Sequence, residues 1–439
     1  MEISRKRTSV SENESGIFIE ELVSERFKTN SFIIRFMTEL TEEGASAFAA
    51  VPFILEDTCR ELPTITAFNR RLGELYGASV RGGLSRFADC AVISFSSTAI
   101  ADKYALSGER ITYETLKLLL DCILDPVTEE NSRGEITFPE KQFELKRQEL
   151  IDEIEADIND KRSYAIKRAG QIIYRGEPAG ISIKGEKERA EKITREDVYS
   201  AYLEMLSRSR IEITFVGCSL PEECRELLRE RLAGIGRRDV FMPQIVPSAV
   251  KPQPEYVTEQ LAVAQCKMVM GFKFSEKATR AVAALFCTIF GASPFSMLFK
   301  NVREKLSLCY YCSASRNMHK RTIYVDSGVE TANIEPAREE ILRQLELIRK
   351  GEFSDEIVEQ SKLLLVSSSK GINEEPRAVS DWYFTQCTEP AQAVVTPEEY
   401  ACDIQNVTRE QIMEFAAGIK LDTVYTLTGN SSERSGSNE

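Results

Sequence analysis

Histidine is almost absent from this chain, which has one, His319, among 439 residues. A peptidase-type zinc site needs more than one histidine, and a serine or cysteine nucleophile needs a nearby base that histidine usually supplies. His319 lies in the polar segment NMHKR, where we expect a surface position. The sequence therefore predicts no catalytic residue, no metal site and no cofactor.

Positive charge and long apolar runs are also scarce. The chain has 56 Lys and Arg against 69 Asp and Glu, whereas nucleic-acid binding needs a basic surface. The apolar run AVAALFCTIFG, residues 281–291, is shorter than the ~20 residues that span a bilayer. Residues 1–16 lack the apolar segment of a secretory signal. We expect a cytoplasmic protein that binds neither nucleic acid nor membrane.

The cysteines fit the same compartment. There are eleven, an odd number scattered through apolar segments, as is typical of reduced thiols in the cytosol. One close pair, Cys309 and Cys312, forms a C-x-x-C, but no second pair or histidine cluster accompanies it to bind zinc. A redox C-x-x-C usually opens a helix, and this one lies in a predicted strand. We expect buried thiols here, and a redox role stays open.

Two segments far apart in the chain follow one pattern. Residues 193–217, ITREDVYSAYLEMLSRSRIEITFVG, and residues 407–429, VTREQIMEFAAGIKLDTVYTLTG, each begin with a threonine before Arg-Glu. Each continues as an amphipathic helix and ends in an apolar strand. Thr194 and Thr408 are predicted N-caps, whose hydroxyls accept a free helical N–H. A repeat of just over two hundred residues predicts a duplicated domain rather than a solenoid.

The chain divides accordingly. Residues 236–256 contain four prolines in a polar setting, which excludes a helix or a central strand and predicts an extended linker. We expect an N-terminal domain over residues 1–235 and a C-terminal domain over residues 257–429. The polar residues 430–439 predict a disordered tail.

Each half shows strands followed by helices. The N-terminal half predicts strands at 17–24 and 31–40, a strand pair over 78–97, and helices at 45–56, 64–76, 112–124 and 139–160. The C-terminal half predicts strands near 257–274, 307–315 and 321–330, and helices at 276–290, 294–305, 335–349 and 354–370. This order is typical of an α+β fold: two homologous domains, each a mostly antiparallel sheet with helices packed on one face.

One junction holds a polar pair. Residues 295–315, FSMLFKNVREKLSLCYYCSAS, pass from a predicted helix through Arg303 to a predicted strand that holds Tyr310. Two interpretations stay open from these residues alone. Arg303 can simply place positive charge at the end of a helix, and Tyr310 can simply pack in the core. Alternatively, both side chains can contact a bound peptide.

Four segments together resemble the insulinase-like, or M16, zinc metallopeptidase family. Residues 296–311, SMLFKNVREKLSLCYY, resemble its C-terminal-domain signature. Residues 68–79, FNRRLGELYGAS, resemble the helix and turn that follow its zinc motif, and residues 146–160, KRQELIDEIEADIND, the helix of its third zinc ligand. ITREDVYSAY, residues 193–202, completes the pattern. The resemblance covers nearly the whole chain.

The resemblance implies an erased zinc site. The family places H-x-x-E-H on an N-terminal helix, where two histidines bind zinc and the glutamate acts as base. The corresponding residues 45–59, ASAFAAVPFILEDTC, contain no histidine. Glu153 survives at the third-ligand position, although a glutamate on this acidic helix is most simply solvated. Without metal no water is activated, so the resemblance implies a chain that is not a peptidase alone.

The resemblance also favours a ligand-binding role for Arg303 and Tyr310. In some bacterial members one subunit carries the zinc motif and the other the Arg–Tyr pair, and together they form a clamshell chamber for an extended peptide. We therefore expect a non-catalytic subunit that pairs with a zinc-bearing relative. Gly82 and Gly83 depart from the family and predict a loosened or bulged strand.

Other roles remain open. The chain can pair with itself, and it can be a scaffold or a chaperone-like peptide binder with no part in proteolysis. It also resembles bacterial proteins associated with aminopentanol modification of elongation factor P. The sequence does not identify the substrate or the partner.

Overall fold

The computed structural model describes residues 3–9, 16–274 and 278–429. These form two compact units that exchange segments along the chain. The N-terminal unit holds Met1–Glu155, Ile181–Gln244 and Ile372–Val394; the C-terminal unit holds Ala156–Gly180, Ile245–Gly371 and Val395–Glu439. The predicted domain limits, 1–235 and 257–429, refer to the two duplicated halves of the sequence rather than to these compact units, and they stay a prediction. The predicted tail, residues 430–439, lies outside the described residues.

The N-terminal unit is built on a sheet with strand order β1-β2-β8-β3-β5-β4. Neighbouring strands are antiparallel except β2 and β8, which run parallel. The strands are β1 (Ser4–Ser9), β2 (Ile17–Val23), β3 (Thr29–Glu39), β4 (Ser79–Phe87), β5 (Cys90–Ile100) and β8 (Arg210–Gly217). A separate small ladder pairs β6 (Glu129–Glu130) with β7 (Ile136–Thr137).

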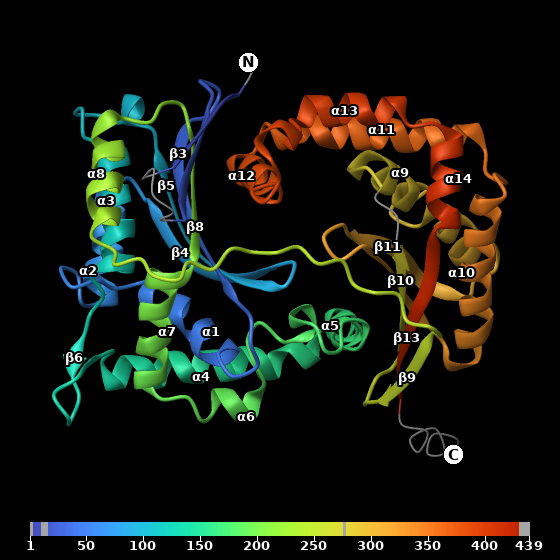
Figure 1. The fold of residues 1–439 in the computed structure, drawn as a ribbon, viewed down its shortest axis with the longest axis horizontal. Coiled ribbons are helices and arrows are strands. Elements are labelled where there is room, and N and C mark those ends of the chain that lie inside the picture. The colour runs from blue at the N-terminus through green and yellow to red at the C-terminus, as the bar shows by residue number, and fades with distance from the viewer. Residues whose placement is uncertain (1–2, 10–15, 275–277, 430–439) are drawn as a thin grey trace, which may run out of the picture. The chain divides into compact units, whose positions relative to one another are not determined.

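Helices cover both faces of this sheet. One face packs against α1 (Ala45–Leu55), α3 (Ile111–Leu124) and α7 (Arg195–Arg208), whose apolar residues share one core with alternate residues of the strands. The other face receives α12 (Pro376–Phe384), so that α3 and α12 lie on opposite sides of the sheet in Figure 1. The unit also contains α2 (Ile65–Glu74), α4 (Glu140–Ala156), α6 (Lys187–Ala190) and α8 (Glu222–Ala233), with 3-10 turns η1 (Asp102–Tyr104) and η6 (Ala391–Ala393).

The C-terminal unit has a sheet of strand order β11-β12-β10-β13-β9. Its strands are β9 (Glu255–Gln260), β10 (Cys266–Phe274), β11 (Cys309–Asn317), β12 (Thr322–Val329) and β13 (Ile419–Thr428). Its helices are α5 (Lys161–Ile173), α9 (Arg280–Phe290), α10 (Ile334–Arg349), α11 (Asp355–Ile372), α13 (Pro397–Asn406) and α14 (Arg409–Ala417). Shorter turns are the π-helical η4 (Phe299–Lys305) and the 3-10 turns η2 (Asp157–Asn159), η3 (Pro178–Gly180) and η5 (Thr331–Asn333).

The two sheets share one topology, which confirms the predicted α+β duplication. The order β2-β8-β3-β5-β4 matches β9-β13-β10-β12-β11 position by position. β2 runs parallel to β8, as β9 runs parallel to β13, and the remaining pairs are antiparallel. The edge strand β4 therefore corresponds to the edge strand β11.

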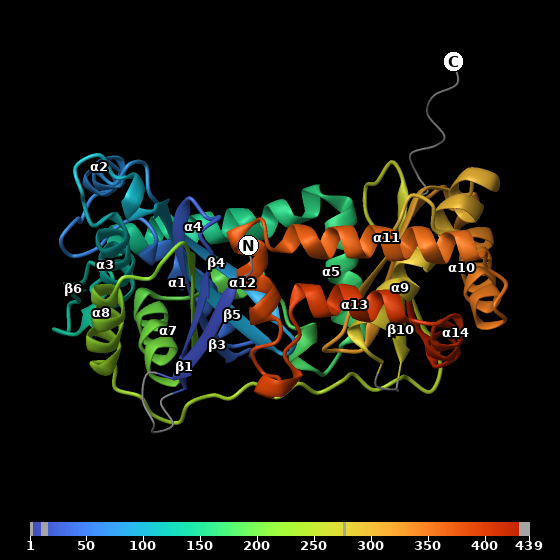
Figure 2. The same cartoon turned by 90° about the horizontal axis from the view of Figure 1, so that it is seen from above.

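Each sheet also receives a helix on its second face, whereas the sequence predicted helices packed on one face. Val379 and Tyr383 of α12 pack on Leu22 and Val216 of the N-terminal sheet. In the C-terminal unit, α5 packs on β10 and β13, with α10 on the opposite side in both Figure 1 and Figure 2. Because both faces are covered, polar side chains on these strands become buried and need partners.

The predicted long helix at 139–160 is broken, which makes the exchange possible. α4 ends at Ala156, a 3-10 turn follows, and the Asp160 carboxylate then accepts hydrogen bonds from the N–H groups of Arg162 and Ser163. This cap starts α5 as a new helix, since it satisfies free N–H groups of the first turn. α5 consequently belongs to the C-terminal unit.

The predicted caps of the repeat are confirmed. Thr194 and Thr408 each accept a hydrogen bond from the third residue of the helix, and that residue's side chain accepts one from the threonine N–H. Such reciprocal capping boxes define where α7 and α14 begin.

Residues 236–254 contain no helix or strand, as the prolines predicted. Part of this segment is nevertheless anchored within the C-terminal unit. Lys320, 1% exposed, donates to the Val246 carbonyl at 2.8 Å, and Lys273, 2% exposed, donates to the Ala249 carbonyl at 2.7 Å. Asp422 lies 3.3 Å from Lys273 and balances its buried charge.

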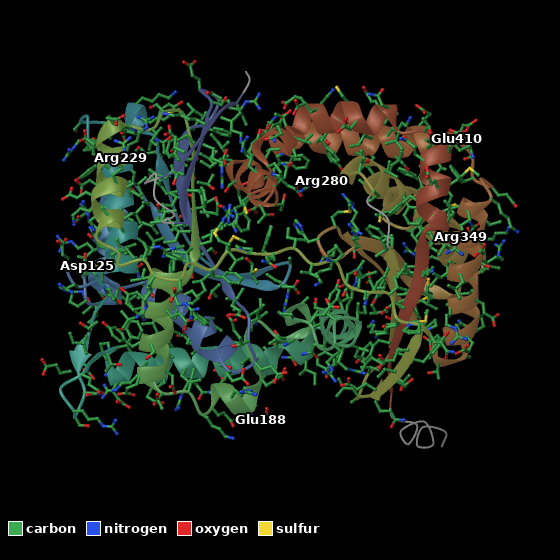
Figure 3. All side chains as sticks on the ribbon, viewed as in Figure 1. Asp125, Glu188, Arg229, Arg280, Arg349 and Glu410 are labelled. Carbon is green, nitrogen blue, oxygen red and sulfur yellow. The ribbon has the colours of Figure 1, made fainter. Side chains whose placement is uncertain are left out.

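Exposed charged side chains occur on several helices. Figure 3 labels examples on separate helices: Glu188 of α6, Arg229 of α8 and Glu410 of α14, all exposed. No helix among the described residues is both long and apolar enough to cross a bilayer.

Candidate functional site

The helix α1, which the resemblance places at the zinc motif of the M16 family, packs in the core of the N-terminal unit. Every residue of α1 except Phe53 is buried, and the helix carries no charged side chain. Its Pro52 carbonyl lies so close to β4 that a Cβ on Gly82 would approach the oxygen to 2.6 Å. Glycine is therefore required at residue 82, because it lets the helix backbone lie directly against the strand.

The strand β4 is regular, which corrects the prediction of a loosened or bulged strand at Gly82 and Gly83. Its register with β5 is continuous from Ser79 opposite Thr98 to Phe87 opposite Cys90. The absence of a side chain at Gly82 serves the approach of α1, and the ladder is not distorted.

A lysine supplies the cation beside this helix. Lys146 of α4 is 6% exposed, and its Nζ lies 2.9 Å from Asp57 and 3.1 Å from Glu149. Glu56, next to Asp57, accepts a hydrogen bond from the Gly82 N–H at 3.1 Å. Burial raises the pKa of Glu56, although that hydrogen bond and Lys146 act in the opposite direction. The acids that follow α1 are thus engaged within the protein.

The residues present do not fit a zinc ion. Glu153 forms an ion pair with Lys184 at 3.2 Å, and its side chain is about half exposed. Over residues 3–9, 16–274 and 278–429, His, Cys, Asp and Glu form no group of three that can hold a metal. His319 lies in the turn between β11 and β12 and is half-buried rather than at the surface. Burial, together with the charge of Arg280, lowers its pKa to about 4.

Arg303 lies in the π-helical turn η4 and is exposed. Its guanidinium carbon is 4.6 Å from the centre of the Phe299 ring, one turn earlier. The chain leaves η4 through Ser307, whose φ is +52°. The Leu308 N–H then donates to the Val302 carbonyl at 3.0 Å, which ties the turn to the start of β11. π-helical turns of this kind are frequent at functional sites.

Tyr310 is the extra residue of a β-bulge. Cys309 pairs with Val329 and Tyr311 pairs with Gly328. Between these two pairs β11 moves on by two residues and β12 by only one, so Tyr310 has no pairing partner. The Tyr310 side chain is 59% exposed. Because a bulge re-aims side chains, this one directs the phenol outward at the sheet edge. Burial in the core, the simpler alternative for Tyr310, is wrong.

The same bulge explains the C-x-x-C. In a regular strand, residues three apart face opposite sides, yet Cys309 and Cys312 are both buried. The bulged Tyr310 takes up one position and brings both thiols to one face. They are free thiols, and a hydrogen bond with Cys312 lowers the pKa of Cys309.

Sequence reasoning missed Glu330, the partner of Tyr310. The Tyr310 hydroxyl donates to Glu330 Oε1 at 2.8 Å, and this hydrogen bond raises the pKa of the phenol. Glu330 directly follows β12, and β12 begins a few residues after β11 ends. A hairpin alignment can place Glu330 near Tyr310, but the bulge that aims the phenol at it has no local signal.

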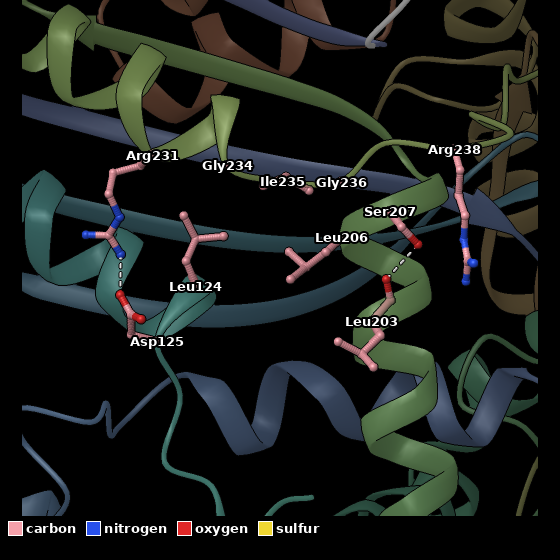
Figure 4. Close-up of a pocket in the computed structure, with 10 residues that line it drawn as sticks. All are labelled: Leu124, Asp125, Leu203, Leu206, Ser207, Arg231, Gly234, Ile235, Gly236 and Arg238. Atoms are coloured by element: carbon pink, nitrogen blue, oxygen red, sulfur yellow. Dashed lines mark hydrogen bonds and ion pairs between the residues drawn. The ribbon is translucent and has the colours of Figure 1, made fainter. Parts of the chain in front are cut away.

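A cavity of about 510 Å³ lies elsewhere in the N-terminal unit, between the ends of α3, α7 and α8. Figure 4 shows Arg231 turned toward Asp125 on one side of it; their charged groups lie 2.6 Å apart, so that this guanidinium is already neutralised. Leu124, Leu203 and Leu206 supply much of the remaining lining. None of the predicted site residues lines this cavity.

A comparison with protein families matches residues 192–365 to the family described as "Peptidase M16 inactive domain". The matched range includes η4 and β11 and leaves out α1. The chain is also 26% identical over 417 residues to the "Probable inactive metalloprotease YmfF" of Bacillus subtilis, covering 94% of this chain and 96% of that protein.

Solved structures share the fold. A conserved protein from Enterococcus faecalis is 24% identical with a TM-score of 0.87, over 98% of this chain and 99% of that chain. A peptidase M16 inactive domain from Pseudomonas fluorescens is 14% identical with a TM-score of 0.76, over 98% and 99% of the two chains. A protease from Helicobacter pylori is 12% identical with a TM-score of 0.78, over 97% and 99%.

Proposed function

Since this chain is similar to inactive homologues of the M16 metallopeptidases, we propose that it belongs to that family and is the non-catalytic subunit of a peptide-processing pair. In this proposal a zinc-bearing M16 relative supplies the metal and the activated water. The present chain supplies Arg303 and Tyr310, which hold an extended peptide. The pair works in the cytoplasm, in keeping with eleven free cysteines.

The exposure of Arg303 and Tyr310 at one edge of the C-terminal sheet carries the proposal. A structural pair would be buried against its own unit, whereas Arg303 is exposed and the phenol is 59% exposed. β11 is an edge strand, to which an extended peptide can add by backbone hydrogen bonds outside Ala314, whose N–H already donates to the Gly291 carbonyl at 3.2 Å. An arginine beside such an edge offers a fork of donors to peptide carbonyls.

The apolar character of α1 supports the division of labour. A chain that held its own zinc would need ligands on that helix, and its buried residues are alanine, valine, proline, leucine, isoleucine, serine and phenylalanine. A glutamate base on this chain would also lack the cation that makes water reactive near neutral pH. In this proposal, catalysis therefore comes from another subunit.

Reconstitution with an H-x-x-E-H relative encoded beside this chain tests the proposal. Peptide hydrolysis is measured for each protein alone with zinc and for the mixture, and association is followed by sedimentation velocity. We expect no turnover from this chain, little from the relative, and full turnover from the mixture. Turnover by this chain alone, or a relative that is fully active and indifferent to it, overturns the proposal.

The same assay separates the other roles. A scaffold would associate with the relative without any change in hydrolysis. A chaperone-like binder that pairs with itself would hold labelled peptide and form a homodimer in the absence of the relative.

A further inference from the structure

The hydrogen bond between Tyr310 and Glu330 sets what Tyr310 can offer a ligand. An ionised carboxylate only accepts hydrogen bonds, so the phenol proton must point to Glu330 Oε1, 2.8 Å away. The outward side of the phenol oxygen then presents lone pairs. A ligand that meets Tyr310 in this state must donate a hydrogen bond.

This state differs from the role that a tyrosine plays toward a peptide carbonyl. A phenol can stabilise an oxyanion only by donating its proton. At this site the proton is already used, and a carboxylate stands beside it. A carbonyl or carboxylate oxygen brought to Tyr310 would face lone pairs and negative charge.

We infer that Tyr310 and Glu330 together form a subsite for a primary ammonium group of an extended peptide, with Glu330 as the residue that determines this specificity. The inference rests on the proposed function, because it takes β11 to be the edge that receives the peptide. The ammonium can come from the peptide N-terminus or from a lysine side chain, which share one chemistry. The raised pKa of Tyr310 agrees with a phenol that keeps its proton for Glu330.

Arg303 and Tyr310 then contact different groups of the peptide. Arg303 has only donors and suits the carbonyl groups of the peptide backbone, while Tyr310 with Glu330 has acceptors and negative charge. The turn through Ser307 and the bulge at Tyr310 keep the two sets at the same end of β11. An extended peptide with an ammonium at this end meets complementary groups from both.

Binding of three fluorescein-labelled peptides to the full-length chain tests the subsite. All three share one extended sequence of alternating valine and threonine. The first has a free N-terminus, the second is N-acetylated, and the third is N-acetylated with one lysine near its N-terminal end. By fluorescence anisotropy we expect the second to bind about fivefold more weakly than at least one of the others, in the range of an exposed charge-assisted contact.

Variants assign the preference to the named residues. In Glu330→Gln the charge is removed at constant shape, and we expect the three peptides to bind alike. Glu304→Gln is the matched control, because it removes one exposed negative charge near the same turn without touching Tyr310; its preference should equal that of the wild type.

A second readout checks the hydrogen bond without any peptide. With tyrosines labelled at Cζ, the Tyr310 signal is assigned from the Tyr310→Phe variant, and its titration is followed by NMR. Glu330→Gln should lower the Tyr310 pKa toward the ordinary phenol value, while Glu304→Gln leaves it unchanged.

The outcomes separate the inference from the proposed function. If all three peptides bind the wild type equally, the ammonium subsite is wrong and peptide binding at β11 stands. If the preference survives in Glu330→Gln, Glu330 does not determine it and the inference is likewise overturned. If none of the peptides binds, the proposed function itself fails, and the subsite fails with it.

Discussion

The edge strands β4 and β11 occupy the same position in the two duplicated sheets, but they differ in pairing and in what contacts them. β4 has an unbroken register with β5 and is backed by α1, which approaches it through Gly82. β11 carries a bulge that turns Tyr310 outward. One edge is specialised for packing within the protein and the other for presenting side chains.

The polar groups at the two edges follow the same division. At β4, the Gly82 N–H donates to Glu56, which lies at the end of the apolar helix. At β11, the Tyr310 hydroxyl donates to Glu330 in a place open to solvent. A shared topology therefore does not imply a shared site, because the side chains that meet each edge decide its use.

We expect the largest effect from deleting one residue of β4, and a matched deletion in β11 serves as the comparison. Deleting Gly83 shifts half of β4 by one position and turns Val80 or Phe87, both buried, toward the wrong face. We expect a loss of at least about 3 kcal/mol in the free energy of unfolding, measured by urea denaturation.

Deleting Tyr310 is the matched experiment at the other edge. The deletion removes the bulge and keeps the pairing of Cys309 with Val329 and of Cys312 with Ser327. We expect the melting temperature to stay within about 2 °C of the wild type. Equal damage from the two deletions would contradict the contrast drawn between β4 and β11.

The next effect concerns the close approach at β4. Gly82→Ala places a Cβ 2.6 Å from the Pro52 carbonyl oxygen, which belongs to rigid helix backbone. We expect a destabilisation of about 2 kcal/mol in urea unfolding, typical of overpacking. Gly83→Ala is the control, since its Cβ meets only the Ser94 hydroxyl at 3.1 Å and that side chain can move. Variants of equal stability would show that α1 does not need the glycine.

The Arg303→Ala variant tests whether the peptide binds at β11. In the reconstituted mixture, Arg303→Ala should lower turnover about tenfold, or about 1.4 kcal/mol in the activation free energy, because the peptide loses a donor fork. Association in sedimentation velocity should be unchanged. Arg81→Ala, which removes an exposed arginine from β4, is the control and should keep full turnover. Equal losses from both variants would indicate a general charge effect.

The smallest effect is a pH dependence at the β4 edge. Burial raises the pKa of Glu56, so its protonated form favours folding, and this contribution is lost as the pH rises from the ordinary carboxyl pKa through the raised value. Glu56→Gln should therefore have a slightly higher urea midpoint than the wild type at pH 7. The difference should vanish near pH 4, where both side chains are neutral. A variant less stable than the wild type at pH 7 would mean that the Gly82 hydrogen bond needs the charged acceptor.

Features that depend on neighbouring residues in the chain could be predicted. The caps at Thr194 and Thr408 need only the threonine and the residue three positions later, so their pattern is visible in the sequence. The strand pair at β4 and β5 and the helix α3 follow from apolar periodicity. The duplicated α+β order was predictable for the same reason.

Features that depend on contacts between distant parts of the chain could not be predicted. The break of the long helix at Asp160 depends on where α5 finds an apolar surface, which is β10 and β13. Glycine is needed at residue 82 because of the Pro52 carbonyl of α1, which is thirty positions away in the sequence. Lys146 has the local pattern of a solvated charge, and only the arrangement of α1 and α4 buries it between Asp57 and Glu149.

The sequence by itself determined the α+β duplication and the likeness to the M16 family. It also excluded that family's zinc site, because one histidine among 439 residues cannot build it. Only the tertiary structure decided that Arg303 and Tyr310 are exposed, and that the phenol proton is given to Glu330. The exposure of Tyr310 depends on a one-residue bulge, and a bulge arises from how two strands pair rather than from either strand alone.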